Sequence, residues 1–169
     1  FGATFNATGG YDNSGAYTFD GVNDFINVTD SPSLDITGNQ ITIAAWVRPI
    51  SSDQGQVFSK ASGTTNGSRK YGLYVGAATD GAPNDLGFEL QTTLGTIDLE
   101  IGGKNAVSPN GTWSHIAGVY NGSLMIWYVN GTVVGTNSSQ SGNIVSRAVP
   151  LSIGRFQTGN VSNFANPEF

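Results

Sequence analysis

The side chains in this chain that could do chemistry are few, and its single histidine is the most conspicuous of them. His115 is the only histidine, and the chain has no cysteine. A lone imidazole cannot form a Cys–His pair or a multi-histidine zinc site. The position of His115 within the β-rich run 113–120 predicts packing or an interstrand hydrogen bond instead.

Asp98 and Glu100 form a second candidate, because they alternate with Ile97, Leu99 and Ile101 and so fall on one side of an expected strand. Two carboxylates on one face can act as the acid and the nucleophile of glycoside hydrolysis. The same alternation fits a strand with a solvated acidic side and an aliphatic inner side. We favour this structural interpretation and expect no catalysis.

Asp20, Asn23 and Asp24 form an acidic turn, which is the third candidate. Calcium binds six to eight oxygens, many of them from carboxylates and backbone carbonyls, and such turns supply them. Asp and Asn also favour turns for purely local reasons. The sequence therefore leaves two interpretations open, a structural calcium site and a simple turn.

Sequons for N-linked glycans are more frequent than chance predicts. With 16 Asn and 33 Ser plus Thr, random order would give roughly three Asn-x-Ser/Thr triplets. The chain has eight, which start at Asn6, Asn27, Asn66, Asn110, Asn121, Asn130, Asn137 and Asn160. Four of them contain the turn dipeptide Asn-Gly, which offers a simpler explanation for those four. We expect N-linked glycans at several of the eight sites, and hence an exported, extracellular protein.

The composition excludes several classes of function. Charged residues make up 11% of the chain, less than half the usual share, and the net charge is −5. Nucleic-acid binding needs clustered Lys and Arg, which this chain lacks. No run of 18 apolar residues is present, so we expect no membrane-spanning segment.

Short β-rich runs separated by Gly, Asn, Ser and Pro predict an all-β fold of two antiparallel sheets in one domain, residues 1–169. In the clearest strand, Ile41 to Arg48, Ile43 and Val47 should face the core while Trp46 lies on the opposite side. Asn121-Gly122 and Asn130-Gly131 predict hairpins. The expected strands are 17–19 and 25–28, paired around the turn 20–24, and 41–48, 56–60, 71–75, 86–92, 96–101, 114–120, 124–129, 132–136 and 149–155.

The order of these runs resembles the laminin-G-like, or concanavalin A-like, jelly-roll family. The resemblance rests on five blocks that cover roughly residues 17 to 155, namely Phe19-Asp-Gly-Val-Asn-Asp-Phe-Ile26, Ile41-Thr-Ile-Ala-Ala-Trp-Val-Arg48, Trp113-Ser-His-Ile-Ala-Gly-Val-Tyr120, Leu124 to Val133 and Leu151-Ser-Ile-Gly-Arg155. It implies a jelly-roll sandwich and makes the turn at Asp20 a candidate for the calcium that relatives often hold. Related β-glucanases use a Glu-x-Asp-x-x-Glu strand, whose third acid is missing after Asp98 and Glu100.

The ends of the chain depart from the family pattern, which usually includes a further strand at each terminus. Three explanations remain open. The chain could be a fragment of a longer protein, a neighbouring copy could complete the sandwich by strand exchange, or the ends could close differently. Strand exchange would generate a homopolymer.

The resemblance implies core positions for Trp46 and Trp113, because both lie in matched strands. Trp127 lies in an apolar run without alternation, so its face cannot be assigned. We therefore expect ligand contacts in the long loops 51–56, 62–70 and 76–85, where the polar and aromatic groups are Arg69, Lys70, Tyr71 and Asp80.

These observations predict a non-catalytic domain for recognition or adhesion at a cell surface, whose partner is a glycan or a protein. One alternative is a structural subunit of a glycosylated surface filament or layer. Another is a carbohydrate-binding module of a larger hydrolase.

Overall fold

The computed structural model describes residues 2–50, 55–62, 69–76, 85–94, 99–155 and 167–168, and these form β-strands and one short 3-10 helix. None of the described residues belongs to a helix that is long and apolar enough to span a membrane. The elements are β1 (Thr4–Asn6), β2 (Ala16–Thr18), β3 (Ile26–Val28), η1 (Pro32–Leu34), β4 (Ile41–Pro49), β5 (Gly55–Ala61), β6 (Arg69–Val75), β7 (Leu86–Leu90), β8 (Leu99–Gly103), β9 (Ser114–Tyr120), β10 (Met125–Val129), β11 (Thr132–Asn137), β12 (Leu151–Ile153) and β13 (Pro167–Glu168).

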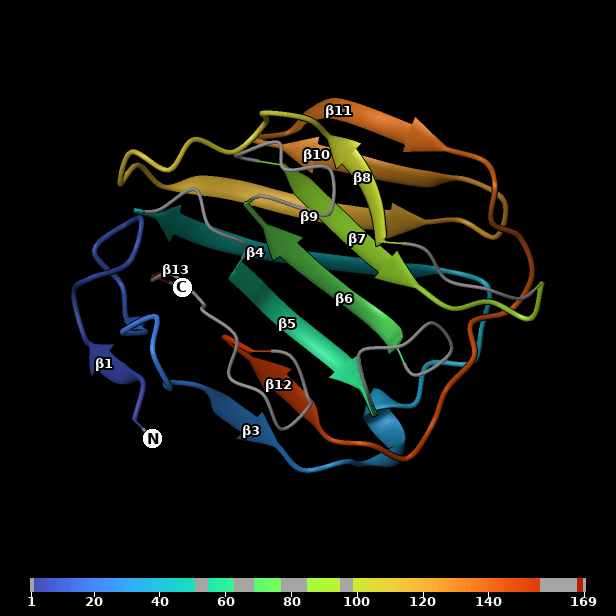
Figure 1. Cartoon of the computed structure of the whole chain (residues 1–169), viewed down its shortest axis with the longest axis horizontal. Helices are drawn as coiled ribbons and strands as arrows, with labels where there is room; N and C mark the ends of the chain where they lie inside the picture. The colour runs from blue at the N-terminus through green and yellow to red at the C-terminus, as the bar shows by residue number, and fades with distance from the viewer. Residues whose placement is uncertain are drawn as a thin grey trace.

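Most of these strands form two antiparallel sheets that pack face to face (Figure 1). One sheet has the order β11-β10-β9-β4-β13, and the other has the order β3-β12-β5-β6-β7-β8. β1 and β2 form a separate two-stranded ribbon. The predicted two-sheet antiparallel sandwich is therefore confirmed.

The alternation of side chains along β4 also follows the prediction. Ile43 and Val47 are buried, whereas Thr42 and Ala44 on the opposite side are exposed. Both Asn-Gly dipeptides lie in the predicted hairpins, one between β9 and β10 and one between β10 and β11. At the second of these turns Asn130 and Gly131 both have positive φ angles, of 50° and 78°, as a two-residue hairpin turn requires.

The pairing expected between the strands on either side of the turn 20–24 is wrong. β2 pairs with β1, while β3 pairs with β12 through contacts such as Leu151 opposite Val28. The turn brings the chain from one strand to the next, but it does not decide which ladder each strand joins. The pairing partner of β3 lies more than 120 positions further along the chain, where no local signal could identify it.

The edge of β4 that faces away from β9 is paired by the chain itself. Pro167 and Glu168 of β13 lie opposite Pro49 and Arg48 of β4 in an antiparallel ladder. Strand exchange between copies, and the homopolymer that would follow from it, therefore has no support in this structure.

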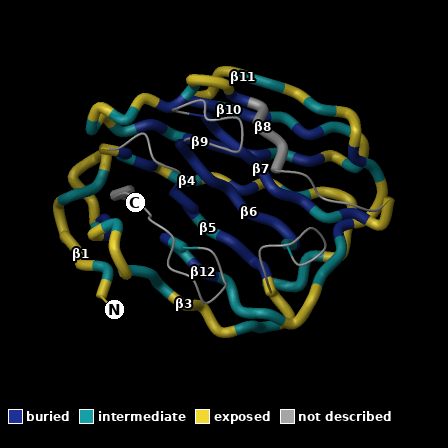
Figure 2. The backbone as a smooth tube through the Cα atoms, in the orientation of Figure 1, coloured by how far each residue is buried: buried dark blue, intermediate teal, exposed yellow. Residues whose placement is uncertain are grey.

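The buried residues lie mainly on the central strands of the two sheets (Figure 2), and they include one hydrophobic core cluster. Phe88 of β7 and Trp127 of β10 meet edge to face with their ring centroids 6.3 Å apart, and both are fully buried. Gly118 of β9 faces the same ring, because a Cβ atom at Gly118 would lie 2.7 Å from Phe88. The missing side chain at Gly118 thus makes room for the phenyl ring from the opposite sheet.

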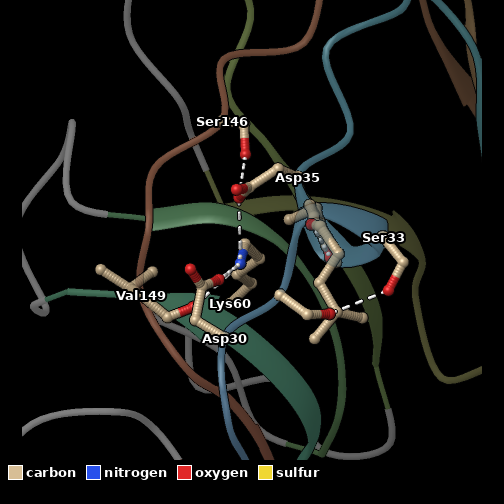
Figure 3. A network of polar contacts seen from close by, with 9 residues as sticks. Asp30, Ser33, Asp35, Lys60, Ser146 and Val149 are labelled. Carbon is tan, nitrogen blue, oxygen red and sulfur yellow. Dashed lines mark hydrogen bonds and ion pairs between the residues drawn. The ribbon is translucent and has the colours of Figure 1, made fainter.

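A fully buried lysine on β5 connects two segments outside the strands to the six-stranded sheet (Figure 3). Lys60 Nζ lies 2.5 Å from Asp30 Oδ1 and 3.3 Å from Asp35 Oδ1, and it donates a hydrogen bond of 2.9 Å to the carbonyl of Val149. The Ser146 hydroxyl donates to Asp35, and this bond together with Lys60 lowers the pKa of Asp35. The network joins β5 to the β3–β4 connection and to the segment before β12.

Polar side chains are buried on the face of the six-stranded sheet that points away from the core. Ser152, Ser59, Gly72 and Glu89 are successive cross-strand neighbours on β12, β5, β6 and β7. Both neighbours of Gly72 along β6 belong to the core, so this row lies on the other face.

Glu89 is the acidic residue in this row, and its pKa is shifted far from the usual value. Its Oε1 lies 3.2 Å from Nη1 of Arg69, while its Oε2 has no hydrogen-bond partner among the described residues. Burial raises the pKa of Glu89 to about 7, although the Arg69 guanidinium opposes the shift. Glu89 therefore changes its charge near neutral pH.

The packing at Gly118 generates a first prediction. We expect Gly118→Ala to lower the free energy of unfolding by about 1–3 kcal/mol, because the added methyl group displaces the ring of Phe88. Urea unfolding followed by tryptophan fluorescence measures this change. Gly38→Ala is the matched control, since no atom lies within 4 Å of the position of its Cβ. Equal stability of the two variants would contradict the packing argument.

The buried acid generates a second prediction. In the folded protein the pKa of Glu89 is about 7, against 4.5 for the ordinary side chain. Glu89 therefore keeps its proton to a higher pH in the folded than in the unfolded state. The free energy of unfolding should therefore fall as the pH rises from about 4.5 to about 7, by a total on the order of 3 kcal/mol. We expect Glu89→Gln to flatten this decline, as measured by urea unfolding at a series of pH values.

The control for this experiment is Asp12→Asn. Hydrogen bonds from Ser14 lower the pKa of the exposed Asp12, so it titrates below the window in question. The wild-type slope should persist in Asp12→Asn. An unchanged slope in Glu89→Gln would show that another group is responsible for the titration.

Candidate functional site

Four aromatic side chains gather on the outer face of the five-stranded sheet, and we call Tyr11, Trp46, Trp113 and His115 the aromatic shelf. Trp46 of β4 and His115 of β9 are direct cross-strand neighbours, and their rings meet edge to face at 5.3 Å. Tyr11 comes from the β1–β2 connection and lies flat on Trp46, with the ring centroids 3.7 Å apart and the planes 10° from parallel. The alternation along β4 explains the arrangement, because burial of Ile43 and Val47 turns Trp46 outward.

The shelf is accessible to solvent. Tyr11 is 57% exposed and Trp46 is 38% exposed, values far above those of the buried core aromatics. A hollow of about 500 Å³ adjoins the rings and is lined by the whole shelf together with Asn130 and Gly131. This volume lies within the range typical of small-ligand sites.

Polar groups surround the rings. Asn130 Oδ1 accepts the backbone N–H of His115 at 2.8 Å. On the other side of Tyr11, Asp12 Oδ1 accepts the backbone N–H of Ser14 at 3.0 Å, and hydrogen bonds from Ser14 lower the pKa of Asp12. The guanidinium carbon of Arg48 lies 5.5 Å from the ring centre of Trp113. An anionic carboxylate, a cation and an amide therefore border the same group of aromatic faces.

This arrangement suits binding. Aromatic faces pack against apolar ligand surfaces, and fixed polar groups around them orient the ligand through hydrogen bonds. Because the rings already contact one another, binding would cost little additional ordering of side chains.

The core positions expected for Trp46 and Trp113 are wrong. Trp46 is exposed and Trp113 is only half-buried, because both stand on the outer face of the five-stranded sheet. Trp127, whose face could not be assigned, is fully buried. His115 has the structural contacts that its position in a strand predicted, and it also contributes to the shelf.

Two of the residues expected to contact a ligand from a long loop lie in a strand. Arg69 and Lys70 belong to β6, which also contains Tyr71 in the strand expected from residue 71, and Asp80 lies outside the described residues. Lys70 is buried with its amine donating to the side-chain carbonyl of Gln91, and burial lowers its pKa. The loop placement is wrong because the strand begins before Tyr71 and continues the ladder with β5 and β7.

Tyr71 packs inside the sandwich. Its side chain is 4% exposed, and its hydroxyl donates a hydrogen bond of 2.7 Å to the carbonyl of Leu34. Burial, together with the nearby Asp35 and Asp30, raises the pKa of Tyr71 to about 12. This tyrosine connects η1 to the core, and it is not available to an external ligand in this structure.

In the acidic turn, the carboxylates of Asp20 and Asp24 accept hydrogen bonds from backbone N–H groups. Asp20 Oδ1 accepts the N–H groups of Val22, Asn23 and Asp24 at 2.9 to 3.3 Å, and Asp24 accepts those of Gly2 and Asp20. In the part of the chain that the structure describes, no three His, Cys, Asp or Glu side chains are grouped as metal ligands. Calcium at this turn stays a prediction. Asp98 lies outside the described residues, as does the side chain of Glu100.

The sequons have two kinds of local geometry. In four of them the Asn side-chain oxygen accepts the backbone N–H of the residue two positions later, which forms an Asx turn. These four start at Asn6, Asn110, Asn121 and Asn137. Asn130 differs, because its oxygen bonds to His115. Asn27 is exposed on β3, while Asn66 and Asn160 lie outside the described residues.

Sequence reasoning missed the shelf for two reasons. The alternation along β4 places Trp46 on the side opposite Ile43 and Val47, whereas the family resemblance implies a core position, and the two signals conflict. Tyr11 had no signal at all, since it lies in a polar connection more than 30 positions from the tryptophan on which it stacks.

Comparison with solved structures finds the same fold in proteins of low sequence identity. The binding domain of Paraclostridial Mosquitocidal Protein 1 superposes with a TM-score of 0.70 at 16% identity, over 99% of this chain and 41% of that one. Domain 4 of AbnA, an extracellular arabinanase from Geobacillus stearothermophilus in complex with arabinotriose, gives 0.65 at 15% identity, over 99% and 74%. Domains LG4-5 of the mouse laminin alpha1 chain give 0.64 at 13% identity, over 90% and 39%.

These likenesses show the fold alone, and the chain spans about two fifths of the toxin domain and of the laminin fragment. A search of curated proteins by sequence found no match. The family model described as the concanavalin A-like lectin/glucanases superfamily matches residues 20–166, which is most of the chain. The chain therefore belongs to the concanavalin A-like lectin/glucanase superfamily.

Proposed function

We propose that this chain is a non-catalytic recognition domain that binds carbohydrate at the aromatic shelf. The observation that carries the proposal is the solvent-exposed indole of Trp46, which is fixed between Tyr11 and His115 beside an open hollow. A contiguous exposed group of aromatic rings beside a hollow is the kind of surface that marks a binding site.

Carbohydrate is the ligand class that fits the chemistry of the shelf best. A sugar ring has an apolar C–H face that packs on an aromatic ring, and it has hydroxyl groups around its rim. The carboxylate of Asp12 and the amide of Asn130 can receive or donate hydrogen bonds at that rim. A flat apolar ligand would form no hydrogen bonds with these polar groups.

The comparisons support a binding role in general terms. The superfamily includes lectins as well as glucanases. Among proteins with this fold, one is an arabinanase domain in complex with arabinotriose and another is the binding domain of a mosquitocidal toxin. A carbohydrate-binding module of a larger hydrolase is the second candidate, and it would use the same shelf.

The extracellular location is part of the proposal and rests on the sequons. Asn6, Asn27, Asn110 and Asn121 are exposed, so glycans at these positions would extend into solvent without disturbing the core. Such glycans would supply the solubility that a chain with 11% charged residues obtains only in part from charge.

The shelf generates a third prediction. We expect Trp46→Ala to weaken binding of an oligosaccharide, identified on a glycan array, by about tenfold, which corresponds to about 1.4 kcal/mol. The protein for this experiment is made in a host without N-glycosylation, and affinity is measured by isothermal titration. The fold should be retained, because the side chain of Trp46 lies outside the core.

Leu94→Ala is the matched control. Leu94 is 65% exposed and does not belong to the shelf, so its loss removes apolar surface elsewhere and should leave affinity unchanged. If the wild-type domain bound no glycan on the array, or bound equally well after Trp46→Ala, the proposed function would be wrong.

A further inference from the structure

One sequon lies at the aromatic shelf itself. Asn130, Gly131 and Thr132 form the turn between β10 and β11, and both Asn130 and Gly131 line the hollow beside Trp46 and Trp113. Asn130 is exposed, and the position of a Cβ atom at Gly131 has no other atom within 4 Å. The side chain of Asn130 is therefore accessible to solvent at the edge of the hollow.

Two hydrogen bonds link Asn130 to His115, one through the side chain of Asn130 and one through its backbone. Its Oδ1 accepts the N–H of His115 at 2.8 Å, and its backbone N–H donates to the carbonyl of His115 at 2.8 Å. The His115 ring in turn contacts Trp46. The amide oxygen is thus engaged, while Nδ2 makes no hydrogen bond to any residue that the structure describes.

This geometry distinguishes Asn130 from the sequons that form Asx turns. At Asn121, for example, the side-chain oxygen accepts the N–H groups of Ser123 and Leu124, so that side chain is oriented by its own turn. At Asn130 the orientation comes from β9, the strand that also carries His115. A sugar on Nδ2 would begin within the hollow.

We infer that Asn130 carries an N-linked glycan whose first sugars lie on the aromatic shelf and control access to it. The inference rests on the proposed function, because it uses the same sugar-binding surface, and on export of the chain. A hollow of about 500 Å³ has room for the first sugar rings of such a glycan. When the glycan on Asn130 occupies the shelf, an external carbohydrate cannot bind there. When that glycan is absent, the shelf is free to bind one.

The modification needs one co-reactant, an oligosaccharide linked to a polyprenyl diphosphate. Asn130 Nδ2 attacks C1 of the first sugar and forms the N–C1 bond. The bond between C1 and the diphosphate oxygen breaks, the polyprenyl diphosphate leaves with the electron pair, and the amide loses one proton. Thr132 completes the sequon and is exposed at the start of β11.

The fourth prediction tests this inference in a host that performs N-glycosylation. Wild type, Thr132→Val and Thr132→Ser are compared, since Val removes the sequon with a side chain of similar shape while Ser retains it. Glycopeptide mass spectrometry should find a glycan on Asn130 in the wild type and in Thr132→Ser, but not in Thr132→Val. Mild oxidation with N-bromosuccinimide, read on the Trp46 peptide, should be several-fold slower in the two glycosylated proteins.

Ser123→Ala is the control for a glycan elsewhere. It removes the sequon of Asn121, in the β9–β10 turn at the opposite end of β10 from Asn130, and should leave the oxidation of Trp46 unchanged. Absence of glycan from Asn130, whether or not other sequons are occupied, would overturn the inference. Equal oxidation rates with and without the Asn130 glycan would overturn it as well.

The two proposals can fail separately. The oxidation experiment needs no external ligand, so it can succeed even if the unglycosylated domain binds nothing on a glycan array. Conversely, if the unglycosylated domain binds sugar at Trp46 while Asn130 is never modified, the proposed function stands and only the present inference is overturned.

Discussion

The structure depends on the close approach of two sheets, and the contact between Phe88 and Gly118 shows what that approach requires. The phenyl ring of one sheet occupies the space that a side chain on the other sheet would need. Trp127 then packs against the edge of the same ring. Interiors of this density tolerate neither a void nor an extra methyl group without cost. Inward positions such as Ile43, Val47 and Ile116 are consequently committed to the core.

The same packing of inward side chains places the residues of the candidate site on the outer face of the sheet. Because Ile43 and Val47 occupy the inner side of β4, Trp46 must lie on the outer side, next to His115 on β9. Tyr11 then covers part of the exposed indole from a different segment of the chain. The aromatic shelf is therefore a consequence of core packing combined with one long-range contact, and its rings are ordered before any ligand arrives. Pre-ordered rings of this kind favour binding because less conformational entropy is lost.

The scarcity of charged residues gives the few buried ones specific structural roles. Lys60 and its two aspartates hold the β3–β4 connection against β5, and Arg69 pairs with Glu89 on the outward face of the six-stranded sheet. Burying a charge is costly unless ion pairs or hydrogen bonds compensate for the lost hydration. The remaining surface relies on Asn, Ser and Thr, and the proposed glycans would extend that uncharged polar character. The glycan proposed on Asn130 would lie at the proposed recognition surface itself.

Properties that depend on neighbours along the chain can be read directly from the order of the residues. Alternation along residues 41–48 assigned the two faces of β4, the Asn-Gly dipeptides located two hairpins, and five blocks in order identified the family. The pairing of β3 with β12, the extension of β6 to include the buried Lys70, and the stacking of Tyr11 on Trp46 follow only from the three-dimensional packing. The physical reason is that side-chain direction within a strand is a local property of the backbone. Burial and pairing depend on residues that are distant in sequence and are brought close only when the two sheets pack.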